Sequence, residues 1–308
     1  MPKARVAAKA RDRVRGRVIK SGLRIGISGW RYAGWRGKFY PKDLPQRREL
    51  EFAASKFNSI EINGSFYSLQ LPSSYRRWFS ETPDDFMFAV KGARYITHMK
   101  RLRDVETALA NFFASGVLAL RQKLGPILWQ LPPSFEFDSE RLSAFFEVLP
   151  RNAQDASKLA GKHNDKLKAR AYRRIDISRP LRYAIEIRHR SFMVPEFFEM
   201  LRKHNIAFVF ADTAKKWPYA EDLTADFIYI RLHGAEKLYV SGYSDNALDW
   251  WAKRIEHWRR GKQSRDAILI GKRVIDNRAR EVFVYFDNDA KVHAPFDALR
   301  LAKRLNIS

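Results

Sequence analysis

The sequence predicts a single (β/α)8 barrel of the TIM-barrel class, and three observations lead to it. Eight short apolar runs rich in β-branched or aromatic residues occur in order, and a stretch of helical periodicity separates most of them. Strands that alternate with helices imply right-handed crossovers and a parallel sheet. Without three strongly basic segments, the 308-residue chain is close to the roughly 250 residues of a typical barrel. No glycine-rich phosphate motif follows the first run, which favours closure over an open sheet.

The expected strands are the apolar runs, at residues 23–28, 59–63, 86–91, 126–131, 183–188, 206–211, 227–232 and 282–286. Helices are expected where apolar residues recur every three or four positions: over 50–57, behind a cap at Asp138 or Ser139, from Pro195 toward Asn205, over 246–260 and over 296–305. Residues 221–224 show only a weak helical pattern.

The basic charge is concentrated in three segments. The chain has a formal net charge of +24 and a pI near 10.3, and residues 1–20, 151–182 and 261–280 hold 18 of those charges. We therefore expect a flexible basic tail over 1–22, a barrel domain over 23–308, and two basic insertions. In a barrel all three lie at the N-terminal face, opposite the face that carries active sites. They are either solvated insertions or an electrostatic anchor for nucleic acid or another polyanion.

Several classes of protein are excluded or disfavoured by composition. The chain contains no cysteine, so it has no disulfide, thiolate zinc site or cysteine nucleophile. No apolar run approaches the 18 residues of a membrane span, and residues 1–20 contain no apolar signal-peptide core. We expect a cytoplasmic protein without a membrane partner. The pattern does not predict an oligomeric state.

Polar residues two positions apart end three of the expected strands: Glu61 with Asn63, Glu186 with Arg188, and Arg231 with His233. Side chains two apart on a strand share a face, so each pair is expected to point into the barrel. Buried charges must pair with one another or with a ligand. The ends of four other strands add Lys91, Gln130, Asp212, Asp287 and Asn288 to the same rim.

These residue types suggest acid–base chemistry on an anionic substrate. Glu61 and Glu186 are the candidates for general acid and general base, and His233 can carry a proton near neutral pH. The cations expected to bind an anionic group are Arg188, Arg231 and Lys91, with Asn63, Gln130, Asp212, Asn288 and His189 as further substrate contacts. The alternative is a purely structural ion-pair network.

A metal site is the less favoured interpretation. Glu61, Glu186, Asp212 and His233 are metal ligands by type. Three cationic side chains in the same ring would repel a divalent ion. We therefore predict no cofactor, with a divalent metal as the alternative.

Two loops above the expected pocket carry further candidates. Trp30 and Tyr32 follow the first strand and either stack on a sugar or base, or form an apolar plug. After the seventh strand, Gly234 and Tyr243 belong to a glycine-containing loop of the kind that holds phosphate in many barrels.

Several stretches resemble the bacterial family called domain of unknown function 72, or YecE-like proteins. They are GISGWRY at 26–32, EINGSFY at 61–67, GPILWQLPP at 125–133, EIRH at 186–189, YIRLHG at 229–234 and YFDN at 285–288. The resemblance spans about 23–305 and implies a TIM barrel. The family commonly has EIDSTFY and FNN, so Asn63, Gly64 and Asp287 depart from its pattern, either as a relocated charge or as a sign of altered activity.

Three functions follow. The leading one is an enzyme, hydrolytic or isomerising, that acts on a polar anionic molecule, sugar-like or phosphorylated. The second is a nucleic-acid-associated protein, such as a metal-dependent phosphodiesterase. The third is a barrel that binds a small ligand without catalysis.

Overall fold

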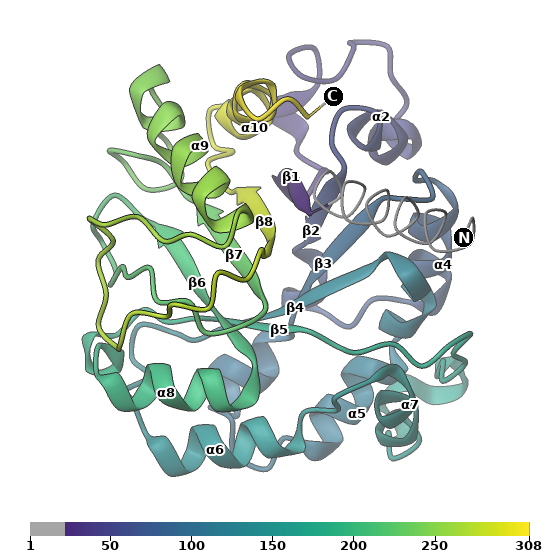
Figure 1. Ribbon diagram of the computed structural model, residues 1–308. Helices are drawn as coiled ribbons and strands as arrows, with labels where there is room; N and C mark the ends of the chain where they lie inside the picture. The colour runs from purple at the N-terminus through teal and green to yellow at the C-terminus, as the bar shows by residue number, and fades with distance from the viewer. Residues whose placement is uncertain (1–21, 308) are drawn as a thin grey trace, which may run out of the picture.

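Eight parallel strands close into a barrel, as the sequence predicts (Figure 1). This computed structural model describes residues 22–307, except the side chains of 168 and 169; the predicted basic tail, apart from its last residue, lies outside these residues. The strands are β1 (Leu23–Ser28), β2 (Ser59–Ile62), β3 (Met87–Lys91), β4 (Leu124–Gln130), β5 (Tyr183–Glu186), β6 (Ile206–Asp212), β7 (Phe227–Leu232) and β8 (Glu281–Phe286). Their bounds agree with the expected runs to within two residues.

The helices form an outer layer around the strands (Figure 1). They are α2 (Glu49–Ala54), α3 (Gly64–Tyr67), α4 (Pro72–Ser80), α5 (Glu106–Ala114), α6 (Ser139–Val148), α7 (Ala153–Ala160), α8 (Pro195–His204), α9 (Asp245–Arg259) and α10 (His293–Arg304). Asp138 caps α6 by accepting a hydrogen bond from the Arg141 amide, and Asn205 ends α8 in the left-handed conformation. Among the described residues, no helix is long and apolar enough to cross a membrane.

The fold has two apolar cores, one inside the barrel and one between the strands and the helix layer. The inner core alternates small residues such as Ala89, Ala184 and Ala207 with the large rings of Tyr229 and Tyr285. The outer core lies between the strands and the helices. Because alternate side chains of a strand point to opposite faces, a residue two positions beyond an inner-core residue also points inward. This rule places charged residues directly above the inner core, at the carboxyl ends of the strands.

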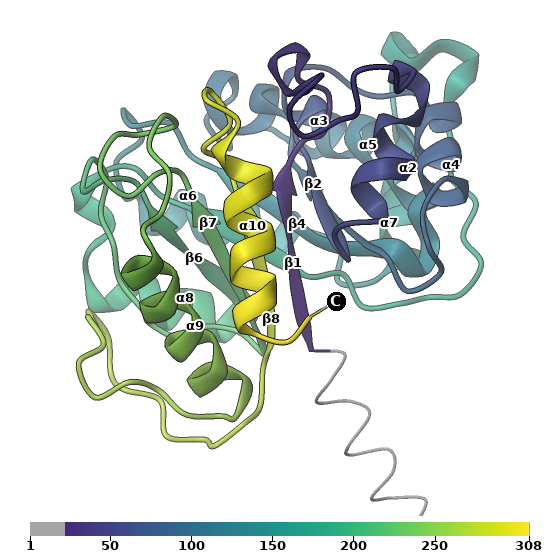
Figure 2. The ribbon, with the colours of Figure 1, turned by 90° about the horizontal axis from the view of Figure 1, so that it is seen from above.

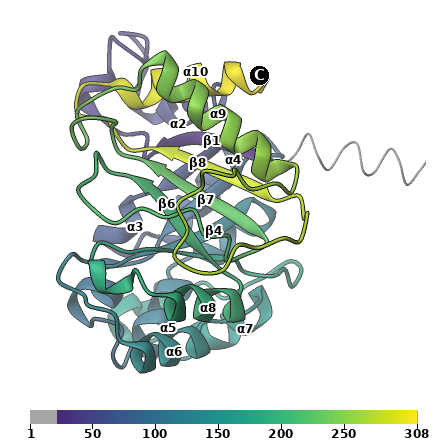
Figure 3. The ribbon, with the colours of Figure 1, turned by 60° about the vertical axis from the view of Figure 1, so that its left-hand side comes forward.

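The basic segment 261–280 replaces a helix on the outside of the barrel. No helix forms between β6 and β7, where the sequence has only its weak pattern at 221–224. The backbone of Glu221 instead pairs with that of Ile268, and the Asp222 carboxylate accepts hydrogen bonds from the amides of Ile270 and Gly271. Figure 3 shows this segment, in yellow-green, over the outside of β6 and β7.

The basic segment 151–182 begins and ends at the N-terminal face but extends well beyond it. Its two ends meet in a bridge between Asn152 and Pro180. Its middle packs along α5 through a hydrogen bond between Asn111 and Asn164, and the Lys166 ammonium lies 4.8 Å from the centre of the Tyr95 ring, just after β3. Figure 2 shows the segment, in teal, reaching the side where the strands end. Thus this insertion is not confined to the face where we expected it.

Candidate active site at the carboxyl ends of the strands

Arg231 of β7 lies at the centre of a buried cluster of charges. Two residues after the inner-core residue Tyr229, it points into the barrel and has no exposed surface. Its guanidinium donates to Glu61 at 2.8 and 3.1 Å, to Glu186 at 2.7 Å and to Asp287 at 2.8 Å. These carboxylates come from β2, β5 and the end of β8. Arg231 and Glu61, which are 170 positions apart, therefore meet at one end of the barrel, as the polar pairs predicted.

Glu61 is fully occupied by its neighbours. One carboxylate oxygen accepts hydrogen bonds from the Ser28 hydroxyl and from Arg231, and the other accepts from the Tyr229 hydroxyl and from Arg231. The side chain has no exposed surface. A carboxylate held by four donors and closed to solvent is a poor general acid or base. These contacts hold Glu61 in place and argue against the acid–base role expected from sequence.

The remaining two acids around Arg231 are held in the ionised form. Burial raises the pKa of Glu186, but Arg231 and Arg188 outweigh it and hold this pKa well below its usual range. Burial also opposes ionisation of Asp287, whereas Arg231 and His233 lower its pKa to about 2. In turn these carboxylates raise the pKa of Arg231 well above the ordinary value. The cluster is therefore charged on both sides at neutral pH.

His233, two residues after Arg231, also belongs to this cluster. Its Nδ1 lies 3.1 Å from Asp287 Oδ2, and its Nε2 lies 3.3 Å from the Arg231 guanidinium and 3.9 Å from Glu186. The ring is buried and meets Tyr239 edge to face. Gln130 also joins the cluster, since it follows Leu128 of the inner core by two residues and is paired with Glu186 in the sheet register.

Lys91, at the end of β3, is buried against an aromatic ring. Its ammonium lies 4.3 Å from the centre of the Phe66 ring, and the side chain is about 7% exposed. Burial, followed by the like charge of Arg231, lowers the pKa of Lys91 to about 8. His98 meets the same ring of Phe66 edge to face, and burial together with Arg188 lowers the pKa of His98 to about 4. The protonated and neutral forms of Lys91 are therefore both populated near physiological pH, whereas His98 is neutral there.

Arg188 connects the cluster to a basic cleft. Its guanidinium donates to Glu186 at 3.0 Å and to the Tyr239 hydroxyl at 3.2 Å, and it stacks on Trp217 at 3.7 Å. Beside it a hollow of about 390 Å³ is lined by Arg188, His189, Arg190, Lys215, Lys216, Trp217 and Pro218. Cations line this hollow and acids do not, which suits an anion.

Asp289 and Tyr32 lie beside the cluster at the first loop. Burial and the nearby charge of Asp287 raise the pKa of Asp289 to about 6. The Tyr32 hydroxyl donates to the Ser28 carbonyl at 2.5 Å, and burial with Asp287 and Asp289 raises its pKa. Asn63 contacts the same hydroxyl. Positions 63 and 287, where the chain departs from the family pattern, therefore both act on the Tyr32 hydroxyl, Asn63 by contact and Asp287 through its charge.

Three predicted contacts lie outside the barrel interior. Asp212 follows the inner-core residue Ala211 by one position and so faces the helix layer, where its partners are Tyr243 and Trp251. Burial raises the pKa of Asp212. Asn288 donates to the Ser241 carbonyl and to Asp297, which fixes the loop before α10. Asp212, Tyr243 and Asn288 thus hold loops in place and do not join the cluster.

Three amides of the loop after β7 are already paired with hydroxyl groups of the same loop. The Gly234 amide donates to the Tyr243 hydroxyl, and the amides of Glu236 and Lys237 donate to the Ser241 hydroxyl. Trp30 is likewise committed, since it is buried edge to face against Trp78 at 5.3 Å. Of the two interpretations of the first loop, the structure favours an apolar plug at Trp30. His189 lines the basic cleft, with its ring nitrogen 2.8 Å from the Ser191 hydroxyl.

Sequence reasoning missed several members of this site. Tyr229 precedes Arg231 by two residues on β7, so the alternation rule contains it. Asp289 lies in the turn after β8, where that rule does not apply. Trp217 and Tyr239 lie in long loops, where no local pattern marks them. Within residues 22–307, no group of three His, Asp or Glu side chains is arranged to hold a metal ion. The acids at the strand ends instead surround a guanidinium.

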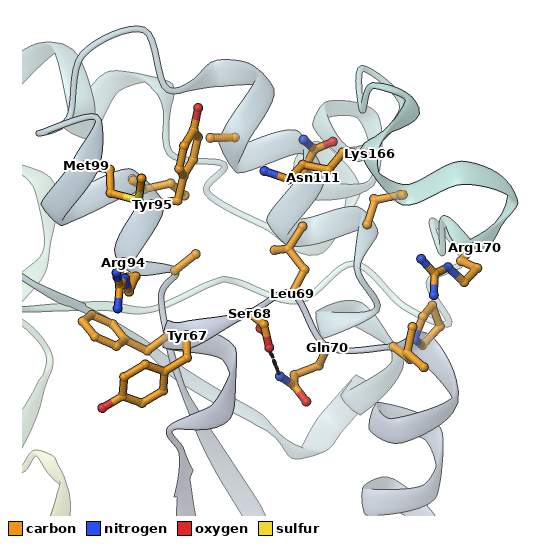
Figure 4. Close-up of a pocket in the computed structure, with 17 residues that line it drawn as sticks. Tyr67, Ser68, Leu69, Gln70, Arg94, Tyr95, Met99, Asn111, Lys166 and Arg170 are labelled. Atoms are coloured by element: carbon orange, nitrogen blue, oxygen red, sulfur yellow. Dashed lines mark hydrogen bonds between the residues drawn. The ribbon is translucent and has the colours of Figure 1, made fainter.

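A second, larger hollow lies beside the barrel mouth (Figure 4). It measures about 690 Å³ and lies between the residues that follow β2 and β3 and the basic segment 151–182. Nine large apolar side chains are exposed among the residues described, and four of them line this groove: Tyr67, Leu71, Tyr95 and Met99. Its charged lining residues are the cations Arg94, Lys166 and Arg170. Two of the exposed aromatics, Tyr67 and Tyr95, thus line this groove, whereas none of the exposed aromatics lies in the first loop.

Known proteins resemble this chain in sequence and in fold. It is 28% identical over 124 residues to the UPF0759 protein YunF of Bacillus subtilis. The aligned stretch covers 39% of this chain and 43% of that protein. It is 34% identical over 86 residues to the UPF0759 protein YecE of Escherichia coli K12, 28% of this chain and 31% of that protein. Each alignment spans less than half of the curated relative.

Solved structures match nearly the whole barrel. A DUF72 family protein from Thermotoga maritima has a TM-score of 0.69 at 26% identity, over 92% of this chain and 99% of its own. A DUF72 family protein from Enterococcus faecalis has a TM-score of 0.66 at 18% identity, and the match covers 93% of this chain and 96% of that one. It shares the fold. The model of the family "Protein of unknown function DUF72" matches residues 24–308. The chain therefore belongs to the DUF72 family.

Proposed function

We propose that this barrel is an enzyme that binds a small polar anion at the carboxyl ends of its strands and moves protons there. One observation carries the proposal: two groups beside one charged cluster titrate near neutral pH. Their environments bring the pKa of Asp289 up to about 6 and the pKa of Lys91 down to about 8. Perturbed groups of this kind concentrate at catalytic sites, since a proton-transfer group works best near the operating pH.

The other charged residues have supporting roles in this proposal. Arg231 and its three carboxylates form a base under the substrate, because every member is paired and only Asp287 is more than 1% exposed, at 14%. Arg188 and the basic cleft beside it attract the anionic group of the substrate. Asp289 accepts a proton once it is ionised, above pH 6.

The test is a turnover screen of the purified protein against a mixture of anionic metabolites. Wild type is expected to consume or retain at least one compound, with a rate that rises through about pH 6 as Asp289 ionises. Asp289→Asn is expected to lower that rate about 100- to 10,000-fold and to remove the dependence near pH 6. Glu199→Gln changes an exposed acid of α8 and serves as the control. The absence of both turnover and retained compound would refute the proposal.

A specific observation also favours a second function, binding of single-stranded nucleic acid in the groove of Figure 4. We propose that bases stack on Tyr67 and Tyr95 while phosphates contact Arg94, Lys166 and Arg170. Sites for single strands combine a basic groove with exposed aromatic rings. Tyr67 is 71% and Tyr95 42% exposed, so both rings are accessible.

The combined change of Tyr67 and Tyr95 to alanine is expected to weaken binding of an oligothymidine strand by about 1–3 kcal/mol for each stacked base. Phe296→Ala removes an exposed aromatic of α10 that does not line the groove, and it should bind like wild type. Binding of the strand by a variant that lacks residues 1–20 is measured at several salt concentrations. The change in the slope of log affinity against log salt concentration, relative to wild type, gives the contribution of the basic tail. Equal affinity of the double variant and wild type would exclude the groove as the binding site.

A further inference from the structure

Lys91 is a buried cation whose side chain forms no hydrogen bond or ion pair within residues 22–307. Five lysine and arginine side chains are buried in the described part of the chain, and the four besides Lys91 donate hydrogen bonds or form ion pairs: Lys123, Arg231, Arg254 and Arg280. Among the residues that the structure describes, the Lys91 ammonium has neither a hydrogen bond nor an ion pair, and it lies 4.3 Å from the centre of the Phe66 ring. A buried ammonium that is left unpaired is costly, so its position calls for a functional reason.

The surroundings of Lys91 favour the free amine. The Phe66 ring excludes water on one side, and the Arg231 guanidinium adds a like charge. Desolvation and a neighbouring cation are the two ways in which proteins activate a lysine as a nucleophile. The charges that act on Lys91 come from four strands: Arg231 from β7, Glu186 from β5, Glu61 from β2 and Asp287 from the end of β8. None of the three acids approaches close enough to form an ion pair with it.

We propose that Lys91 is a nucleophile that forms an imine with the aldehyde or keto group of a small anionic substrate. The neutral amine attacks the carbonyl carbon and forms a carbon–nitrogen bond. The carbonyl oxygen takes up a proton and the nitrogen loses one, which gives a carbinolamine. A second proton on that oxygen lets it leave as water, and a carbon–nitrogen double bond remains. Hydrolysis later reverses these steps and restores the amine.

This inference rests on the proposed function and narrows its substrate to an anionic carbonyl compound. The carbonyl group would lie against Lys91, at the end of β3, and the anionic group toward Arg188 and the cations around it. Asp289, which titrates near pH 6, is available to donate and accept the protons that the sequence of steps requires. An imine would let the enzyme draw electrons from the neighbouring carbon, which is the chemistry of aldol cleavage, dehydration and isomerisation.

Reductive trapping tests the imine directly. The full chain is incubated with glyoxylate, an aldehyde that carries a carboxylate, and with cyanoborohydride, which reduces an imine to a stable carboxymethyl-lysine. Peptide mass spectrometry then gives the rate at each lysine. At pH 8 a lysine with a pKa near 8 has about 100-fold more free amine than one with an ordinary pKa. We expect Lys91 to react at least ten times faster than the exposed lysines, with a rate that rises through about pH 8.

Lys123 is the internal control for this experiment. It is also buried, but its ammonium donates to the carbonyls of Phe79 and Thr82 at 2.6 and 2.7 Å, far from the strand ends that carry the cluster. It should stay unmodified, and Lys91→Arg should leave only the slow reaction of exposed lysines. An unmodified Lys91 beside modified exposed lysines would overturn the imine.

The two proposals fail in different ways. If wild type turns over a metabolite and Lys91 is never trapped, the imine is wrong and the acid–base enzyme stands. If Lys91 is trapped by glyoxylate but no anionic metabolite is consumed or retained, the lysine is a nucleophile and the proposed enzyme is wrong. Trapping at Lys91 together with loss of turnover in Lys91→Arg supports both.

Discussion

Replacing Arg231 with methionine is expected to lower the free energy of unfolding by about 3–5 kcal/mol. The variant leaves Glu61, Glu186 and Asp287 in the barrel without the guanidinium that each of them contacts within 3.1 Å. Removal of one partner from a buried ion pair costs this much because the remaining charge is uncompensated. The loss is a large part of the 5–15 kcal/mol that stabilises a typical protein. Chemical denaturation of both proteins measures it.

Two further variants show whether the loss comes from unpaired charge. Arg188→Met removes a guanidinium at the edge of the same cluster, and we expect a smaller loss because this side chain is 11% exposed and contacts one carboxylate. Conversion of Glu61, Glu186 and Asp287 to their amides in the Arg231→Met background should recover part of the lost stability, since no buried carboxylate is then left without its guanidinium. A loss for Arg231→Met below that for Arg188→Met would contradict the proposed network.

Acid is expected to destabilise wild type more than Asp287→Asn, by roughly 2 kcal/mol. The pKa of Asp287 falls from an ordinary 3.8 to about 2 in the folded protein. Because the folded pKa is the lower one, the ionised carboxylate stabilises the folded state above about pH 4, and this contribution is lost as the pH falls toward 2. Asparagine has no charge to lose, so its curve should be flatter over that range.

Urea unfolding from pH 6 down to pH 2 measures the two curves. At pH 6 the asparagine variant should be the less stable protein, and the difference should shrink as acid protonates Asp287. Asp249→Asn, at an exposed acid of α9, is the control and should follow wild type. Parallel curves for wild type and Asp287→Asn would show that Asp287 does not have a lowered pKa.

Much of the site could be predicted because a strand fixes the direction of its side chains. Glu61, Glu186 and Arg231 each follow an inward residue by two positions, and the structure brings all three together. The same rule places Asp212 outside the cluster, because it follows the inward residue Ala211 by one position and so faces outward. Its prediction failed because it was placed by its nearness to a strand end and not by its phase.

Other features depend on contacts that no local pattern contains. Glu61 is closed to acid–base work by hydroxyls from β1 and β7, which lie 33 and 168 residues away. The segment 261–280 covers β6 and β7 because no helix does, and its composition indicates only its charge. The pKa values of Lys91 and Asp289 depend on the depth at which the loops bury them.

The central claim is that charged groups from separate strands form one unit around Arg231, and a double-mutant cycle between Glu186 and Arg231 tests it most directly. These residues lie on β5 and β7, strands that are not neighbours, with 2.7 Å between Arg231 Nη1 and Glu186 Oε2. Unfolding free energies of wild type, Glu186→Gln, Arg231→Met and the double variant should give a coupling of about 1–3 kcal/mol. Additive losses, within about 0.5 kcal/mol, would mean that the two side chains do not meet.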